Sequence, residues 1–192
     1  MIDWPVNLPT LNSRATGIAT SGGNDARSFI LRPLGESDID PIFQACQDPT
    51  ISAFTRIPYP YDREMAEEFV RGTALGYLNH QSITFAIEIQ GELAGTIALH
   101  SLSIANHCAE VGYWMSANHR GQGICTSALK MISELALGVM GFRRVQGLAD
   151  DDNFASHKVL ERAGYHREAT LAQRVTKNDG SQKDMLLYAR VQ

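Results

Sequence analysis

Residues 119–132, HRGQGICTSALKMI, join a turn with two glycines and an arginine to the start of an apolar helical face. The residues of that face recur at helical spacing: Ile124, Ala128, Ile132, Leu135 and Val139. A glycine-rich turn at the start of a helix presents unpaired N–H groups and the positive end of the helix dipole to an anion. The stretch therefore predicts a phosphate-binding turn within a fold of helices and strands.

Helices and strands are expected to alternate before this turn. The sequence predicts a strand over residues 29–34, a helix with Ser37 as its N-cap, a loop over residues 48–61 and a helix capped near Asp62. Three further stretches have the composition and the apolar runs of strands: residues 83–89, 92–99 and 108–115.

The alternation continues after the turn. The helix is expected to end at Gly141, and a strand over residues 143–149 follows it. Asn153 is the expected N-cap of a shorter helix that stops at Gly164. Residues 169–191 are expected to form a hairpin.

This order of elements predicts an α/β (α+β) fold, with one mixed sheet and helices on both of its faces. The chain has 192 residues, of which 44% are hydrophobic, which is enough for one sizeable core. We expect that domain over residues 28–192. Residues 1–27 are rich in Ser, Thr, Asn and Gly and are expected to form a polar N-terminal arm.

Charge and cysteine content limit the classes of function. The net charge is -4 and no basic field is present, which argues against a nucleic-acid ligand. Cys46, Cys108 and Cys125 are far apart and are expected to be reduced thiols. The six histidines lack the spacing of metal ligands, so no metal is expected. The opening residues lack a signal-peptide pattern and no apolar run reaches about 18 residues, so we expect a cytoplasmic protein outside the membrane.

Several classes of phosphate-binding turn are distinguishable by sequence. A Walker A turn needs Gly-Lys followed by Ser or Thr, but Gly123 is followed by Ile124. A dinucleotide fingerprint needs a third small residue, where this chain has Thr126, and it belongs to the first βα unit of a domain. These residues alone are also compatible with a strand-to-helix turn that needs glycine for its backbone conformation and binds no ligand.

The segments AEVGYWMSANHRGQGICTSAL (residues 109–129) and NFASHKVLERAGY (residues 153–165) together resemble the GNAT acetyltransferase superfamily. Within it, they are most similar to the ribosomal-protein alanine N-acetyltransferases. The family signature, Arg/Gln-x-x-Gly-x-Gly/Ala, falls on Arg120, Gly123 and Cys125, and the cysteine departs from the usual small residue. The resemblance extends over about residues 29–191 and is strongest around the turn.

The resemblance implies a mostly antiparallel sheet that is splayed between its fourth and fifth strands, with acetyl-CoA bound at the splay. Backbone N–H groups of the turn hold the pyrophosphate in the family, and glycines let the main chain approach its oxygens. The residues expected to bind the cofactor are Tyr113, Trp114, Met115, Arg120, Gly121, Gln122, Gly123, Ile124, Cys125, Asn153 and Ser156. The Met115 N–H is expected at the thioester carbonyl.

The implied reaction is the direct attack of an amine on the acetyl thioester in a ternary complex. Both kinds of biological amine are protonated at neutral pH and need a base, and Glu110 is the candidate. Many family members have a tyrosine on the last helix that protonates the leaving thiolate, but this chain has Leu160 there. Ser156 is the candidate donor in its place. Structural roles for Glu110 and Ser156 remain open alternatives.

The sequence thus predicts an acetyl-CoA-dependent N-acetyltransferase that acts on a protein or peptide N-terminal α-amine. Two alternatives are kept: an enzyme that acetylates a small amine (a polyamine, an amino acid or an aminoglycoside), and a CoA-binding module without catalysis. Three aspartates occupy residues 150–152, and they are compatible with either a solvated loop or an acidic rim that attracts a cationic amine. Assembly, including a homodimer, is left open.

Overall fold

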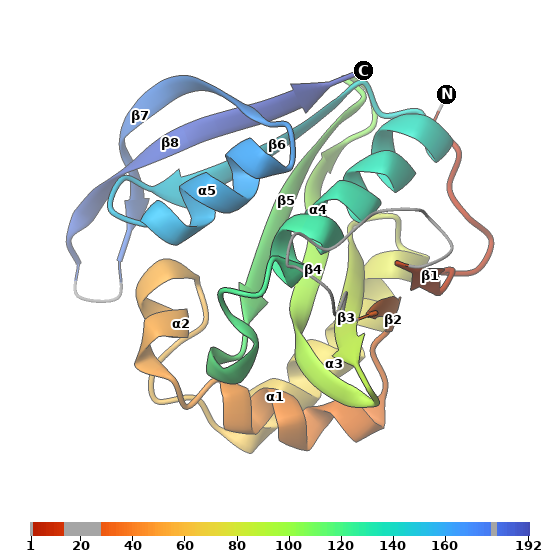
Figure 1. Cartoon of the computed structure of the whole chain (residues 1–192), viewed down its shortest axis with the longest axis vertical. Helices are drawn as coiled ribbons and strands as arrows, with labels where there is room; N and C mark the ends of the chain where they lie inside the picture. Colours follow the sequence, from red (N-terminus) through yellow and green to blue (C-terminus); the bar gives the residue numbers. More distant parts are fainter. Residues whose placement is uncertain (1, 14–27, 178–179) are drawn as a thin grey trace.

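An eight-stranded sheet crosses the molecule in the computed structural model, which describes residues 2–13, 28–177 and 180–192 (Figure 1). The strand order is β1-β2-β3-β4-β5-β6-β8-β7. The strands are β1 (Leu11–Asn12), β2 (Ile30–Pro33), β3 (Ile83–Ile89), β4 (Glu92–Ser103), β5 (Cys108–Met115), β6 (Arg144–Asp150), β7 (His166–Thr176) and β8 (Gln182–Val191). All neighbours are antiparallel except β5 and β6, which confirms a mixed, mostly antiparallel sheet.

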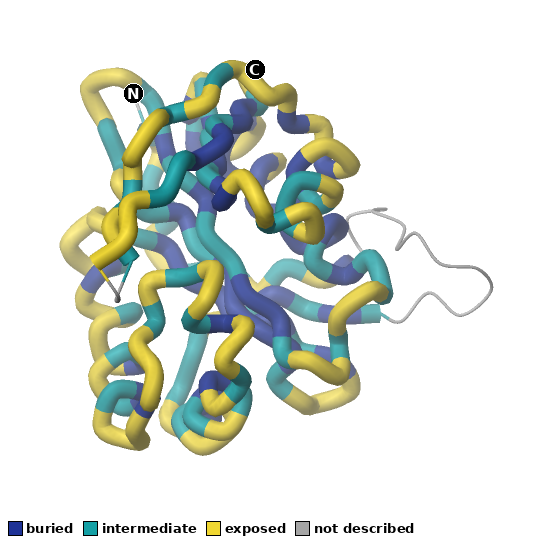
Figure 2. Tube along the Cα trace, turned by 90° about the vertical axis from the view of Figure 1, so that its left-hand side faces the viewer, coloured by how far each residue is buried: buried dark blue, intermediate teal, exposed yellow. Residues whose placement is uncertain are grey.

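Helices cover both faces of this sheet, as predicted. They are α1 (Ile39–Ala45), α2 (Pro49–Phe54), α3 (Arg63–Leu78), α4 (Ile124–Glu134) and α5 (Phe154–Arg162). Short 3-10 helices lie at Glu36–Asp38 and Ala117–His119, and a π-helical turn, Leu135–Val139, extends α4. In Figure 1, α4 and α5 lie in front of the sheet and α3 lies behind it. Figure 2 shows that buried residues concentrate along the central strands.

The sheet is splayed between β5 and β6. Their parallel pairing runs from Cys108 opposite Arg144 to Val111 opposite Gly147, and there it stops. Beyond that point β5 continues to Met115 paired only with β4, and β6 continues to Asp150 paired only with β8. The predicted opening between the fourth and fifth family strands is therefore confirmed.

Alternation along β5 divides its side chains between two cores. Val111 and Met115 belong to the large core beneath α4, and Tyr113 packs against the same core. Trp114 lies instead in a second core with Ile42 and Val70, on the side of α1 and α3. The sheet thus separates Tyr113 and Trp114, although they are neighbours in sequence.

The predicted N-cap of the first helix is wrong. Ser37 lies inside a 3-10 turn, and Gly35 and Asp38 are the cap residues of that turn and of α1. The Asp38 carboxylate accepts a hydrogen bond from the Gly35 N–H and forms an ion pair with Arg32. Asp38 is buried, and burial is the largest single influence on its pKa and acts to raise it. The bonds from Arg32 and from the Gly35 N–H, with the charge of Arg32, together outweigh burial and hold the pKa below the usual range.

The predicted loop over residues 48–61 contains a helix, α2. Asp48 is its N-cap and accepts from the Thr50 N–H at 2.9 Å, and Pro49 occupies the first helical position. Both are favourable helix-start signals. Six residues are too few to display an amphipathic period, which is why the sequence pattern did not reveal α2.

Most of the predicted N-terminal arm, residues 1 and 14–27, lies outside the described residues. The described part packs on the domain. The ring of Trp4 stacks on His80 at a centroid distance of 4.5 Å and lies 5.3 Å from the ring of Tyr77. Residues Leu11–Asn12 form β1, which pairs with β2 at the edge of the sheet.

Candidate active site

The N-terminus of α4 is open toward the glycine turn. Gly121 and Gly123 have φ values of 73° and 75°, a left-handed conformation that favours glycine. Gly123 is the N-cap and has no side chain to cap the helix. The first intrahelical bond runs from the Ser127 N–H to the Gly123 carbonyl, so the N–H groups of the three preceding helical residues lack intrahelical acceptors. Such an arrangement is suited to bind an anion.

The side chain of Arg120 does not point toward this opening. Its Nη2 lies 2.8 Å from Asp48 Oδ2, its Nη1 donates to Thr50 Oγ1, and its Nε donates to the Met115 carbonyl at 3.0 Å. Gln122 likewise donates to the Asn118 carbonyl, within the turn. Arg120, a residue of the predicted family signature, therefore stabilises the turn and links it to α2.

The backbone of β5 faces the splay. The Ser116 N–H donates to the Ala94 carbonyl at 2.9 Å, so Gly95 and Met115 form a non-hydrogen-bonded pair in the β4–β5 ladder. The Met115 N–H therefore points away from β4, toward the side where β6 has separated. Trp114 has the opposite parity, and its side chain is buried in the second core, on the other face of the sheet from Tyr113.

Glu110 lies where the two strands begin to separate. It is level with Gln146 on β6, one residue before the last paired position, and Gln146 Nε2 donates to its Oε2 at 3.2 Å. His100 is opposite Glu110 on β4. Burial lowers the pKa of His100, Glu110 opposes that shift, and Arg56 adds to it. A half-buried carboxylate thus lies at the start of the splay, opposite an imidazole on the neighbouring strand.

Ser156 is held by two neighbours at the start of α5. Asn153 is the N-cap, as predicted, and its Oδ1 accepts from the Ser156 N–H at 3.1 Å. The hydroxyl oxygen of Ser156 lies 2.8 Å from that of Tyr113 on β5. Burial raises the pKa of Tyr113 well above its ordinary value. The predicted residues Tyr113, Asn153 and Ser156 therefore come together on the α5 side of the splay.

Leu160 and Cys125 fill space near these groups. Leu160 is buried, and a Cβ at Gly147 would approach its Cδ2 to 2.8 Å, so the helix lies close to β6 at the last paired position. Cys125 is half-buried, and burial raises the pKa of its thiol to about 12. Neither residue offers an acidic proton at neutral pH.

Lysines pair with two of the three aspartates at the end of β6. Asp150 is buried and forms an ion pair with Lys177, whose Nζ also donates to the Ala53 carbonyl of α2. Asp152 pairs with Lys183 at 3.1 Å. Asp150 is therefore not part of a solvated loop, and both carboxylates are less available to a cationic ligand than their sequence suggests.

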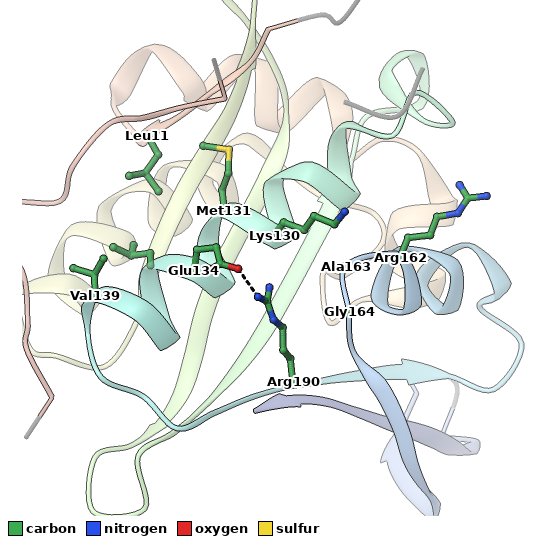
Figure 3. A pocket seen from close by; sticks show the side chains of 10 residues that line it. Leu11, Lys130, Met131, Glu134, Val139, Arg162, Ala163, Gly164 and Arg190 are labelled. Atoms are coloured by element: carbon green, nitrogen blue, oxygen red, sulfur yellow. Dashed lines mark hydrogen bonds and ion pairs between the residues drawn. The ribbon is translucent and has the colours of Figure 1, made fainter. Parts of the chain in front are cut away.

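A hollow of about 770 Å³ lies farther along α4 (Figure 3). Lys130 and Glu134 of α4 and Arg190 of β8 line it, and Glu134 pairs with Arg190 across it. None of the predicted site residues lines this hollow. The site that unites the open helix start, the splayed strands and the paired hydroxyls is thus a different place on the molecule.

Within residues 2–13, 28–177 and 180–192, no group of three or more His, Cys, Asp or Glu residues is arranged to hold a metal ion. The described helices include none that is long and apolar enough to span a membrane.

Sequence comparison decides the family. Residues 28–166 match the family described as "Acetyltransferase (GNAT) domain". The chain belongs to the GNAT acetyltransferases. As a member of this family it is an N-acetyltransferase. The matched range contains both segments on which the sequence resemblance rested, residues 109–129 and 153–165.

Named GNAT relatives act on different amines. The ribosomal-protein-serine acetyltransferase of Escherichia coli is 28% identical over 169 residues, which cover 86% of this chain and 94% of the relative. The spermidine N(1)-acetyltransferase of the same species is 22% identical over 155 residues, or 76% of this chain and 77% of the relative. The structure of a ribosomal L7/L12 α-N-protein acetyltransferase, in complex with coenzyme A, aligns with a TM-score of 0.77, 26% identity and coverage of 85% and 93%.

Several residues around the site were not predicted from sequence. Gln146 and His100 flank Glu110, and Lys177 joins Asp150 to α2. The partner of Glu110 on β6 follows from strand register, which a single sequence does not supply. Lys177 lies next to the turn of the last hairpin, and nothing in its local sequence indicates a partner more than 100 residues away.

Proposed function

We propose that this GNAT enzyme transfers the acetyl group of acetyl-CoA to the α-amine of a protein or peptide N-terminus. The observation that carries the proposal is the open N-terminus of α4 beside the splay of β5 and β6. The three free N–H groups and the left-handed glycines fit a pyrophosphate, and the unpaired edge of β5 fits an extended arm that adds as a strand.

The proposed roles follow from position. Gly121, Gln122, Gly123, Ile124 and Cys125 contribute backbone N–H groups to the pyrophosphate, with Arg120 as their support. The Met115 N–H, which points into the splay, donates to the thioester carbonyl as negative charge develops there. The amide of Asn153 and the ring of Tyr113 line the pantetheine arm.

Glu110 is proposed as the base. As the amine nitrogen bonds to the carbonyl carbon, its proton passes to the Glu110 carboxylate, directly or through water. Gln146 keeps that carboxylate oriented by donating to one oxygen and leaving the other available. Breakage of the C–S bond leaves a thiolate, and the hydroxyl of Ser156 donates to it.

The charge around the site favours a singly charged amine. Lys177 and Lys183 neutralise Asp150 and Asp152, which would otherwise attract a polycation. The ribosomal-protein relatives support a protein N-terminus, and the spermidine relative keeps a small amine as the second candidate. A CoA-binding module without catalysis is the third, because Leu160 stands where many family members have tyrosine.

Two measurements test the proposal. Calorimetric titration with acetyl-CoA is expected to show micromolar binding, roughly -8 kcal/mol, with no heat from ATP or NAD. Mass spectrometry then follows acetylation of peptides that begin with Ser or Ala, of the same peptides with blocked N-termini, and of spermidine. Acetylation of the free peptides alone supports the proposal, transfer to spermidine alone favours the second candidate, and binding without transfer favours the third.

A further inference from the structure

The contact between Tyr113 and Ser156 points to a role for the tyrosine that its family resemblance does not supply. The two hydroxyl oxygens are 2.8 Å apart, a normal distance for a strong O–H···O hydrogen bond. The residues come from opposite walls of the site, since Tyr113 lies on β5 and Ser156 on α5. We propose that Tyr113 is a positioning residue that directs the proton of Ser156 toward the departing thiolate, an inference that rests on the proposed function.

The direction of this hydrogen bond follows from the acidity of the two groups. A phenol is a much better donor than an aliphatic alcohol, so the short contact is best used with Tyr113 donating to Ser156 Oγ. The other acceptor near Tyr113, the Ser156 carbonyl, is 3.5 Å away, which is at the limit for a hydrogen bond. With its oxygen accepting this bond, Ser156 keeps its own proton for another acceptor.

The usual alternative for such a serine is thereby removed. A serine in the first turn of a helix commonly uses its hydroxyl in local bonds to backbone. Among the described residues, the hydroxyl of Ser156 contacts the side chain of Tyr113 and makes no bond to backbone, while Asn153 caps the Ser156 N–H. The serine is therefore fixed at two points before any ligand arrives, which reduces the reorganisation that catalysis would otherwise require.

Tyr113 does this without losing its proton. Burial disfavours the phenolate, so the tyrosine acts as a neutral donor throughout the reaction. The step remains balanced: the C–N bond forms, the C–S bond breaks with its electron pair on sulfur, and the proton of the amine passes to Glu110. The thiolate accepts a hydrogen bond from Ser156, which in turn accepts one from Tyr113.

The chain contains a matched control for the hydroxyl pair. Tyr165 Oη and Ser133 Oγ are 2.7 Å apart and both residues are buried, with Ser133 on α4 and away from the splay. Removal of the Tyr165 hydroxyl deletes the same kind of bond from the same core. It is expected to change stability without changing turnover.

The test is a double-mutant cycle in kcat with acetyl-CoA and an acceptor peptide. Tyr113→Phe is expected to lower kcat about tenfold, the equivalent of one hydrogen bond, with the KM for acetyl-CoA within about twofold of the parent value. In the Ser156→Ala background the same substitution is expected to have no effect on kcat, because the hydroxyl through which it acts is gone. Tyr165→Phe is expected to keep the parent kcat.

Three results would overturn this inference while leaving the proposed function in place. One is an equal loss from Tyr113→Phe with and without Ser156, and another is a change in KM alone. The third is a kcat for Tyr113→Phe equal to that of the parent, which would defeat this inference and leave the proposed function intact. Absence of transfer by the parent chain to every acceptor would defeat both. Thermal denaturation of all variants separates a folding defect from a loss of catalysis.

Discussion

Arg120 Nη2 and Asp48 Oδ2 lie 2.8 Å apart, so the turn at the start of α4 is joined to the N-cap of α2. The same guanidinium reaches the Met115 carbonyl at the end of β5. One side chain thus connects the proposed pyrophosphate turn, the strand at the splay and the short helix on the opposite side of the sheet. Arg120 determines the relative position of these three parts.

Arg120→Ala is therefore expected to weaken acetyl-CoA binding by about tenfold and to destabilise the fold by about 1–2 kcal/mol, since Asp48 is only partly exposed and Met115 is buried. Calorimetric titration and urea unfolding measure the two effects. Arg63→Ala serves as the control, because Arg63 forms ion pairs at the surface with Asp40 and Glu67. An unchanged acetyl-CoA affinity in Arg120→Ala would contradict the supporting role.

Glu110→Gln is expected to lower kcat by about a hundredfold or more and to leave acetyl-CoA binding intact, because the amide cannot accept the proton of the amine. Steady-state kinetics and calorimetry check the two halves of this prediction. Glu92→Gln, at the exposed start of β4, is the matched control and should retain full turnover. A variant at position 110 with parent turnover would remove Glu110 from the reaction.

Gly123→Ala should destabilise the protein by about 1–2 kcal/mol, because an L side chain is strained at a φ of 75°. Acetyl-CoA affinity should fall as well if the turn cradles pyrophosphate. Gly72→Ala in α3 is the opposite case: its Cβ would meet nothing within 4 Å, and helix propensity predicts a gain of about 0.5–1 kcal/mol. Urea unfolding compares the two, and equal effects would contradict the backbone argument.

Lys177→Met should cost about 3 kcal/mol in the free energy of unfolding, because it leaves the carboxylate of Asp150 buried without its cation. Lys183→Met removes the exposed lysine that pairs with Asp152 and should cost much less, because both members of that pair are solvated. Chemical denaturation resolves a difference of that size. A similar cost for both variants would mean that the Asp150 pair is effectively solvated.

The lowered pKa of His100 predicts a dependence of stability on pH. In the unfolded chain the imidazole takes up a proton near its ordinary pKa of 6.5, whereas burial in the folded chain delays that uptake to lower pH. The unfolded state therefore binds more protons below about pH 6.5, and stability falls as pH decreases through this range. Glu110 faces His100 and reduces the effect, while Arg56 increases it.

His100→Gln should remove that part of the decline. The free energy of unfolding of the variant is expected to change less between pH 7 and pH 5 than that of the parent, as measured by urea unfolding at each pH. Parallel pH profiles for the two proteins would show that His100 takes up its proton equally in both states.

The sequence predicted the parts of the fold that depend on local pattern. Strands 83–89 and 108–115 have the predicted bounds, and Asn153 and Asp62 cap their helices through the expected side-chain bonds. Apolar runs, alternation and capping residues act over a few positions, so one sequence contains the whole signal. Helix α2 was missed because it is too short to show a period.

In the candidate site, too, sequence predicted the local features and missed those that depend on contacts between distant residues. The glycine turn could be predicted from sequence because its residues are contiguous and their backbone conformations favour glycine. Sequence did not predict which way Arg120 points, because the ion pair with Asp48 spans 72 positions and depends on how α2 packs. It also did not predict the contact between Tyr113 and Ser156, which depends on the distance between β5 and α5.

The single parallel pair in the sheet has a consequence for folding. β1 to β5 and β6 to β8 each form a block of antiparallel strands, and only four opposed positions, from Cys108 opposite Arg144 to Val111 opposite Gly147, connect them. The junction is therefore short, and a parallel pair is slightly less stable per residue than an antiparallel one, so it is the place where local unfolding separates the two blocks most readily. Amide hydrogens along this junction should exchange with solvent sooner than those inside either block, and a bound ligand that bridges the two should slow that exchange.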